Sequence, residues 1–207
     1  GKKVEVTAAD GSKTVYEANH IILATGARSR ELPALKQDGK KIIGYREAMT
    51  LTQQPESMVV VGSGAIGSEF AYFYNTIGTK VTLIEFLPNI VPVEDEEVSK
   101  QLERSFKKAG MSILTSAEVT RVDKDGDKCK VYVNTRKGEE IFEADVVLSA
   151  VGVATNLEGL GLEEAGVASE RGKVLVDDFY RTNVEGVYAI GDIVKGPALA
   201  HVASHEG

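Results

Sequence analysis

The sequence has little cysteine and no long apolar run. Cys129 is the single cysteine among 207 residues, so no disulfide can form within the chain. A chain without internal disulfides fits a reducing compartment, and we expect a cytoplasmic protein. No apolar run approaches the roughly 20 residues that a membrane-spanning helix needs. The first residues, GKKVEV, contain no apolar segment of the signal-peptide type.

Long basic runs and metal-binding patterns are also missing. The net charge is −7, and lysine and arginine are dispersed among acids apart from short pairs such as 40–41 and 107–108. Nucleic acid and anionic membranes are therefore not expected partners. The three histidines, His20, His201 and His205, do not have the spacing of metal ligands, and no metal site is expected.

The first 57 residues read as short strands followed by a connector. VEVTAAD and TVYEA alternate around Asp10-Gly11 and predict a hairpin. HIILATGA, residues 20–27, predicts a buried strand. Residues 28–57 contain scattered proline and glycine and predict a connector with one short helix near 46–52. A domain boundary is expected in this connector.

From residue 58 the pattern predicts two βα units. SMVVVG and KVTLIEF predict buried strands, and each precedes a helical pattern. The first helix, starting near residue 65, has apolar positions 66, 70, 73, 74 and 77 and ends at Gly78. The second spans 95–109, with Val98, Leu102 and Phe106 facing inward. A βαβα order favours a parallel sheet.

After Gly110 the hydrophobic period falls to two. Residues 112–152 predict several short strands, with turns at 125–126 and 137–138 and a last apolar strand, DVVLSAVG. Residues 157–165 predict a short helix, KVLVD and VEGVYAIGD predict strands, and ALAHVASHEG predicts a helix. The predicted class is α/β, with a Rossmann-like parallel sheet and an added antiparallel meander.

GSGAIG, residues 62–67, has the glycine spacing of a dinucleotide-binding loop. It follows a predicted strand and opens a predicted helix, where a diphosphate could bind the helix N-terminus. Glu85 ends the next strand, 23 residues after Gly62. A carboxylate there would accept hydrogen bonds from both hydroxyls of the adenine ribose and repel a 2′-phosphate, so NAD is favoured over NADP. The alternative is that the glycines serve only a tight βα turn.

Four motifs in fixed order resemble the flavoprotein disulfide reductases, a family of pyridine nucleotide-disulfide oxidoreductases. They are ILATGA at 22–27, VVVGSGAIGSE at 59–69, AVG at 150–152 and YAIGD at 188–192. GPALAHVASHEG at 196–207 is similar to the dihydrolipoamide dehydrogenases within that family. The resemblance implies FAD and NAD as cofactors. It also implies a redox cysteine pair and a catalytic His-Glu pair that this chain does not contain, so we expect a central fragment that is inactive alone.

The resemblance assigns domains as well. Residues 1–41 would be the C-terminal part of an FAD-binding domain, and 42–154 the NAD-binding domain. Residues 155–207 would return to the FAD-binding or central domain and stop before an interface domain. Cys129 lies on the alternating segment CKVYV and is interpreted as a core thiol rather than a redox group.

Site residues follow by matching motifs, and none of them is catalytic. The NAD diphosphate and nicotinamide would be approached by Gly62, Ser63, Gly64, Ala65, Ile66, Gly67, Ser68 and Glu69. The adenine ribose, the adenine and the nicotinamide would lie near Glu85, Val119 and Gly152, respectively. FAD would be bound by Thr25, Gly26, Ala27, Asp192, Ala198, Leu199, Ala200 and His201. Glu69 could instead be a solvated helix residue, and Val119 an ordinary strand valine. Gly152 could be only a strand-ending turn, Asp192 an ordinary helix or turn cap, and His201 a structural residue.

One motif departs from the family pattern. Many relatives carry GRxPN after AVG, whereas this sequence reads GVATN at 152–156, which removes a charge beside the nucleotide.

The resemblance also implies an activity and partners. The complete enzyme would oxidise dihydrolipoamide on lipoyl domains of 2-oxoacid dehydrogenase complexes, and it would act as a homodimer. Two alternatives remain at this point. One is another flavin reductase, such as a transhydrogenase, mercuric reductase or NADH oxidase. The other is a non-enzymatic NADH-sensing flavoprotein.

Overall fold

The computed structural model describes residues 2–207, leaving aside the side chain of Asp125, and it forms two compact units. One unit is Ser29–Gly152. The other combines Gly1–Arg28, of which Gly1 lies outside the described residues, with Val153–Gly207. Leu35, which precedes the boundary expected at 41/42, is buried in a core of the Ser29–Gly152 unit together with Ile42.

A five-stranded parallel sheet organises the Ser29–Gly152 unit. Its strand order is β5-β12-β6-β7-β8, and all neighbouring strands run parallel. The strands are β5 (Ile42–Ile43), β6 (Ser57–Val61), β7 (Lys80–Ile84), β8 (Ser112–Leu114) and β12 (Val146–Ser149). Helix α2 (Ala65–Thr76) connects β6 to β7, and α3 (Glu96–Lys108) connects β7 to β8. The predicted α/β class with a parallel sheet is confirmed.

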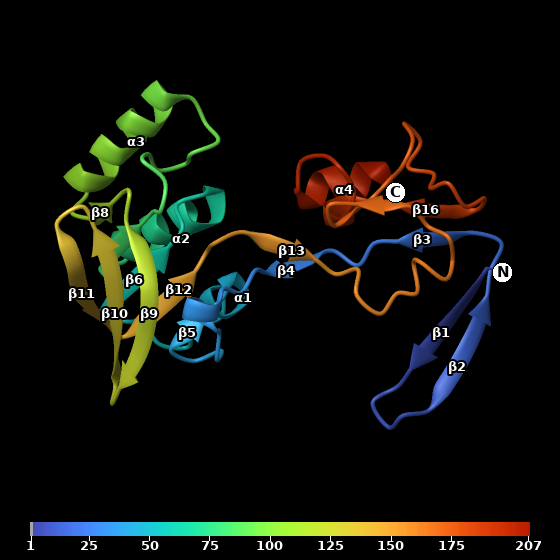
Figure 1. Ribbon diagram of the computed structural model, residues 1–207, viewed down its shortest axis with the longest axis horizontal. Coiled ribbons are helices and arrows are strands. Elements are labelled where there is room, and N and C mark those ends of the chain that lie inside the picture. Colours follow the sequence, from blue (N-terminus) through green and yellow to red (C-terminus); the bar gives the residue numbers. More distant parts are fainter. Residues whose placement is uncertain (1) are drawn as a thin grey trace. The chain divides into compact units, whose positions relative to one another are not determined.

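The two faces of this sheet bury different cores, as strand alternation requires. Met58 and Val60 pack with α2 and α3 on one face, and Val59 and Val61 point into the core on the other. That second core is closed by the antiparallel meander β9 (Glu118–Asp125), β10 (Lys128–Thr135) and β11 (Gly138–Ala144), in the order β11-β10-β9 (Figure 1). The predicted meander is therefore confirmed.

Cys129 lies on β10 in this second core. Its side chain is fully buried, and burial raises the pKa of the thiol. A buried thiol with a raised pKa is a poor nucleophile, so its interpretation as a core residue is confirmed.

Helix α2 packs on the sheet through smaller residues than the sequence suggests. The buried positions are Gly67, Ser68, Ala71 and Tyr74. Phe73 and Ile77, expected on the inner face, are 53% and 44% exposed. Tyr74 is buried and Phe70 packs against the core as expected, so the expected stripe was wrong only at Phe73 and Ile77, where the inner face is occupied by the small residues.

A hydrogen bond ties α2 to α1 (Tyr45–Ala48), the short helix expected near 46–52. The Tyr74 hydroxyl donates to the Ala48 carbonyl at 2.5 Å, and burial raises the pKa of Tyr74. This contact gives the one buried phenol of α2 a partner within the core.

Helix α3 has an acidic N-terminal cap. The Asp95 carboxylate accepts from the N–H of Glu97 at 2.8 Å and caps the helix. Phe106 is buried as expected, whereas Val98 is 55% exposed. The inner position of the first turn belongs instead to Ser99, whose hydroxyl donates to the Val91 carbonyl at 3.4 Å.

The other unit is built from short pairs of strands. The hairpin of β1 (Lys3–Thr7) and β2 (Lys13–Glu17) is confirmed, and β3 (Ile21–Leu23) runs parallel to β16 (Val187–Ala189). Two further strand pairs are β4 (Ala27–Ser29) with β13 (Val153–Thr155) and β14 (Ser169–Glu170) with β15 (Lys173–Val174). The helices of this unit are η2 (Gly191–Ile193) and α4 (Ala200–Glu206). A third short helix, η1 (Pro33–Leu35), belongs to the Ser29–Gly152 unit.

Three expectations for this unit were wrong in detail. Ile22 is 56% exposed, because one side of β3 is not covered by the described residues. Residues 157–165 form turns rather than a helix, and Gly159 and Gly161 have positive φ, which interrupts helical geometry. The strand expected over KVLVD is confined to β15.

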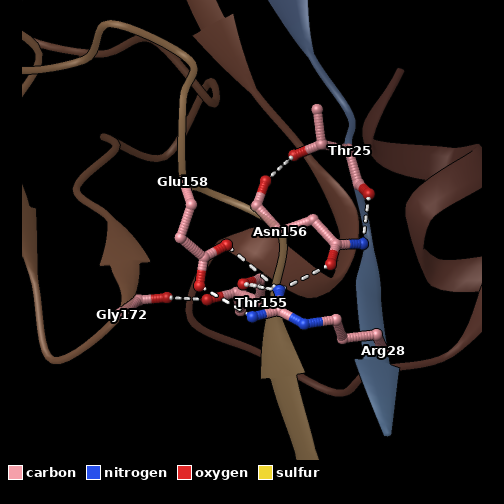
Figure 2. Close-up of polar contacts among 6 residues, drawn as sticks. All are labelled: Thr25, Arg28, Thr155, Asn156, Glu158 and Gly172. Atoms are coloured by element: carbon pink, nitrogen blue, oxygen red, sulfur yellow. Dashed lines mark hydrogen bonds and ion pairs between the residues drawn. The ribbon is translucent and has the colours of Figure 1, made fainter.

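A polar cluster holds the returning chain against β4 (Figure 2). The Arg28 guanidinium donates to both carboxylate oxygens of Glu158, at 2.8 and 3.0 Å, and to Asn156 Oδ1 at 2.9 Å. Thr25 Oγ1 donates to the Asn156 carbonyl at 2.7 Å, and Asn156 Nδ2 donates back to the Thr25 carbonyl at 3.0 Å. This Arg28 cluster links two segments 128 residues or more apart.

The cluster also bears on the missing GRxPN arginine. The sequence suggested that its loss removes a charge from this segment. In the structure the Arg28 guanidinium, from the neighbouring strand β4, lies at this segment. Its Nη1 also donates to the Thr155 carbonyl at 3.2 Å. Glu158 balances that charge, so the segment carries an ion pair rather than an isolated cation.

The glycine loop gives a stability prediction. A Cβ on Gly67 would lie 1.9 Å from the Gly62 carbonyl oxygen, so Gly67→Ala must push α2 away from β6. We expect the free energy of unfolding, measured by urea denaturation, to fall by about 1–3 kcal/mol. Gly64→Ala is the matched control, because its Cβ meets no described heavy atom within 4 Å. Equal stabilities of the two variants would contradict the close packing.

The Arg28 cluster predicts an acid titration. Hydrogen bonding from Arg28 lowers the pKa of Glu158 to about 2. Because the folded-state pKa is lowered, the stabilisation is complete above the usual carboxyl range and is lost as the pH falls toward 2. NMR titration of Glu158 should show its pKa return toward about 4.3 in Arg28→Met. The pKa of Glu158 should stay unchanged in the control variant Arg30→Met. An unchanged pKa in Arg28→Met would exclude the ion pair.

Candidate functional site

The three glycines of residues 62–67 occupy positions with different steric requirements. Gly62 has φ +95°, and a Cβ there would lie 2.4 Å from the Ala150 carbonyl oxygen. Gly67 is required by its contact with Gly62, described above. Gly64 has an ordinary φ of −61°, and its Cβ would point into open space. Contacts within the described chain therefore explain two glycines but not Gly64, whose bare Cα leaves room for a ligand at the backbone.

That open position coincides with the start of α2. Gly64 is the N-cap residue, no described side chain caps it, and the first turn contains no acid. The first N–H groups of a helix lack partners within the helix and carry partial positive charge. With Ala65 exposed, this end of the 12-residue helix can receive an anion such as a diphosphate.

A buried carboxylate lies beside the loop. Glu85 follows β7 and is 7% exposed. Its Oε2 accepts from the backbone N–H of Ser63 at 2.8 Å and from the Ser63 hydroxyl at 2.7 Å. Its Oε1 accepts from the Leu87 N–H at 2.8 Å. Three donors thus fix a carboxylate at the carboxyl end of the sheet, next to the glycine loop.

Ser63 is joined to two further segments through its carbonyl. That oxygen accepts from the Ser68 hydroxyl at 2.9 Å and from the Val91 N–H at 3.0 Å. Val91 has φ +39°, which is strained for a β-branched residue. No pattern in the sequence indicates Val91 or the Ser63–Glu85 contact, because both depend on how the segment after β7 folds back.

Glu69 stands one turn after the glycine loop. It is exposed and lines a groove of about 460 Å³ between α2 and α3, together with Ala65, Val91, Leu102 and Phe106. Ile66, the residue after Ala65, is half-buried. The predicted loop residues 62–69 therefore divide into exposed, half-buried and fully buried positions.

The last two predicted NAD residues, Gly152 and Val119, lie in the same unit. Gly152 is exposed, has φ +101° and follows β12, whose end pairs with the end of β6. Val119 is half-buried on β9, two residues after Ala117, whose N–H donates to the Glu85 carbonyl at 3.0 Å. Ser29–Gly152 thus contains every residue predicted for NAD.

The residues predicted for FAD all lie in the other unit. Thr25–Ala27 follow β3, and Asp192 follows β16, so both sets stand at the carboxyl ends of paired parallel strands. Gly26 has φ +65° and Asp192 is half-buried on η2. The Lys173 ammonium donates to the Asp192 carbonyl.

Helix α4 begins at Ala200, so Ala198 and Leu199 precede it and His201 lies in its first turn. All four are exposed. The Glu206 carboxylate, at the far end of α4, accepts from the Gly191 N–H at 2.6 Å and docks the helix beside Asp192. The predicted helix is confirmed.

Among residues 2–207 no group of three or more His, Cys, Asp or Glu is arranged to hold a metal ion. None of the described helices has both the length and the apolar character needed to cross a bilayer.

Comparison with known sequences gives consistent relatives. The family described as pyridine nucleotide-disulphide oxidoreductase matches residues 1–207. Dihydrolipoyl dehydrogenase from Rhizobium etli is 49% identical over 93% of this chain and 40% of its own length. Leghemoglobin reductase from Glycine max is 41% identical over 99% of this chain and 40% of its own length. The chain therefore spans about two fifths of the length of these curated relatives.

Solved structures agree with the sequence comparison. LpdA from Mycobacterium tuberculosis superimposes with a TM-score of 0.87 at 35% identity, over 99% of this chain and 44% of LpdA. The HOCl-induced flavoprotein disulfide reductase RclA from Escherichia coli shares the fold, with a TM-score of 0.85 at 23% identity, over 99% of this chain and 46% of RclA. Because the family match extends through all of its residues, the chain belongs to the pyridine nucleotide-disulphide oxidoreductase family.

Proposed function

We propose that this chain is the NAD-binding central portion of a dihydrolipoyl dehydrogenase, which oxidises dihydrolipoamide to lipoamide and reduces NAD to NADH. The observation that carries the proposal is the open Gly64 at the uncapped start of α2, with the Glu85 carboxylate fixed beside it. A diphosphate site next to a buried ribose acceptor is the pattern of a dinucleotide site. The names of the curated relatives supply the substrate class.

In this proposal the chain binds and orients NAD. The backbone around Gly64 and Ala65 binds the diphosphate, and Glu85 binds the adenine ribose. Val119 packs near the adenine, while Glu69 and Gly152 lie near the nicotinamide. Ser63 and Ser68 act from inside the loop, since both are buried, and Gly62, Ile66 and Gly67 shape it.

The second unit is proposed to contribute to FAD binding. Thr25, Gly26 and Ala27 would lie near the flavin nucleotide, and Asp192 would accept a hydrogen bond from a ribityl hydroxyl. Ala198, Leu199, Ala200 and His201 are assigned to FAD by resemblance alone. Bound FAD would supply the two-electron chemistry between a disulfide and nicotinamide. The redox cysteine pair would come from outside these residues, because Cys129 is single and buried.

The partners and compartment belong to the complete protein. Dihydrolipoamide carried on lipoyl domains of 2-oxoacid dehydrogenase complexes is the proposed reductant, and a homodimer is the proposed assembly. The cytoplasm is the proposed compartment, although a relative from Pisum sativum is named as mitochondrial.

Gly64 provides the sharpest test of the NAD site. In the complete natural protein, Gly64→Ala places a methyl group where the diphosphate would approach the backbone. We expect NADH binding, followed by fluorescence titration, to weaken by at least about tenfold, the scale for losing a charged hydrogen bond. The unfolding free energy should fall by less than about 1 kcal/mol, since only an N-cap preference changes.

A control and a contrary outcome frame this test. Gly126→Ala is a suitable control, because Gly126 has φ +59° in the β9–β10 turn and its Cβ meets no described atom. It should cost some stability without changing the affinity for NADH. Undiminished NADH binding by Gly64→Ala would argue against a diphosphate at this loop.

The activity is tested on the complete natural protein. We expect a bound flavin in the visible spectrum and rapid NADH formation when dihydrolipoamide and NAD are added. The physical reason is that this chain supplies a nucleotide site while the family supplies a disulfide relay. Bound flavin without turnover would exclude the dehydrogenase and favour another flavin reductase or an NADH-sensing flavoprotein.

A further inference from the structure

Asp192 is a half-buried acid whose carboxylate makes no hydrogen bond or ion pair with another described residue. It lies on η2, shortly after the carboxyl end of β16, which runs parallel to β3. Ligands of parallel sheets bind outside the carboxyl ends of the strands. The carboxylate is therefore free to accept hydrogen bonds from a hydroxyl-bearing ligand. Because the aspartate side chain is short, its direction depends on the backbone on either side of it.

Two charged side chains bind that backbone. The Glu206 carboxylate, at the last position of α4, accepts from the N–H of Gly191, the residue before Asp192, at 2.6 Å. The Lys173 ammonium, from β15, donates to the carbonyl of Asp192 itself. Hydrogen bonds with an ionised partner are about twice as strong as neutral ones. Charges of opposite sign therefore hold the backbone on the two sides of Asp192.

Close packing keeps Glu206 at this position. Gly191 has φ +73°, and a Cβ on it would lie 3.2 Å from the Cβ of Ala203, which precedes Glu206 on α4 by three residues. Such a contact is closer than most contacts between Cβ atoms. Helix α4 therefore lies directly on the segment that leads into Asp192.

A phenol also bonds the Glu206 carboxylate. It belongs to Tyr180, and burial together with the nearby Glu206 carboxylate raises the pKa of this tyrosine. Tyr180 lies in a turn with φ +57°, where the Asp177 carboxylate accepts from the N–H groups of Phe179 and Arg181 at 2.9 and 3.0 Å. Two segments, η2 and this turn, thus hold Glu206 before a ligand binds.

We propose that Glu206 and Lys173 are positioning residues of the FAD site, which hold the Asp192 carboxylate in the direction that accepts a ribityl hydroxyl. This proposal rests on the FAD role proposed for Asp192. Neither positioning residue needs to touch the cofactor, because each acts on the backbone beside Asp192. Their loss lowers the affinity for FAD through Asp192 and not through a contact of their own.

The experiment is a double-mutant cycle on FAD affinity in the complete natural protein. FAD is titrated into the apoprotein of wild type, Glu206→Ala, Asp192→Ala and the double variant, and binding is followed by flavin fluorescence. Each single substitution should weaken FAD binding about 10-fold to 100-fold, the scale for losing a hydrogen bond with a charged partner. In the Asp192→Ala background, Glu206→Ala should weaken binding by less than about threefold, because the carboxylate that it positions is already absent.

Two further variants of α4 test the contact itself. Glu206→Gln keeps an acceptor oxygen for the Gly191 N–H, so it should retain most of the affinity that Glu206→Ala loses. Ser204→Ala is the matched control, because the exposed Ser204 hydroxyl donates to the Ala200 carbonyl within the helix at 3.0 Å. Its affinity for FAD should equal that of wild type. A loss in Ser204→Ala as large as in Glu206→Ala would indicate a general disturbance of α4 and overturn the role of Glu206.

The remaining outcomes separate this proposal from the proposed function. A full loss by Glu206→Ala in the Asp192→Ala background would overturn the positioning role, since the effect would then be independent of Asp192. Undiminished affinity in Glu206→Ala would overturn it as well and leave the FAD site standing. If Glu206→Ala does not fold, Lys173→Met enters the same cycle and decides by the same criterion. Failure of wild type to bind FAD, or unchanged affinity in Asp192→Ala, would refute the FAD assignment itself.

Discussion

The contact between β6 and the start of α2 is the constraint on which the rest of the Ser29–Gly152 unit depends. The carbonyl of Gly62 leaves no room for a side chain on Gly67, so the first turn of the helix lies directly on the strand end. The buried face of α2 has the small residues Gly67, Ser68 and Ala71 beside Tyr74, while Phe73 faces outward. It also fixes the direction in which the helix N-terminus opens, at Gly64.

From this contact the site is organised by buried polar groups. Ser63 is held between strand and helix, and it orders both the Glu85 carboxylate and the segment that contains Val91. Unpaired buried donors and acceptors are costly, so such a network has few alternative arrangements. The strained Val91 backbone is maintained by its neighbours, as strain near binding sites commonly is.

The sequence predicted those features that depend on local periodicity and turn residues. The parallel sheet, the meander and α4 were found because their apolar patterns and glycines are local. Phe73, Val98 and the 157–165 segment were misjudged, because tertiary packing decides which face is buried and whether a glycine-rich segment becomes helical. The residues grouped for NAD lie together in one unit, but the Ser63–Glu85 contact and the Arg28 cluster arise between distant segments and leave no pattern in the sequence.

The pairing of β4 with β13 brings the two ends of the Ser29–Gly152 unit close together. The Ser29–Gly152 unit starts at the last residue of β4 and ends immediately before β13, and the Arg30 N–H donates to the Gly152 carbonyl at 2.9 Å. Its two ends are thus a single hydrogen bond apart. A short peptide joining them would close the unit into a ring without stretching its backbone. An excised or circularly permuted form of this unit would therefore keep both of its cores intact.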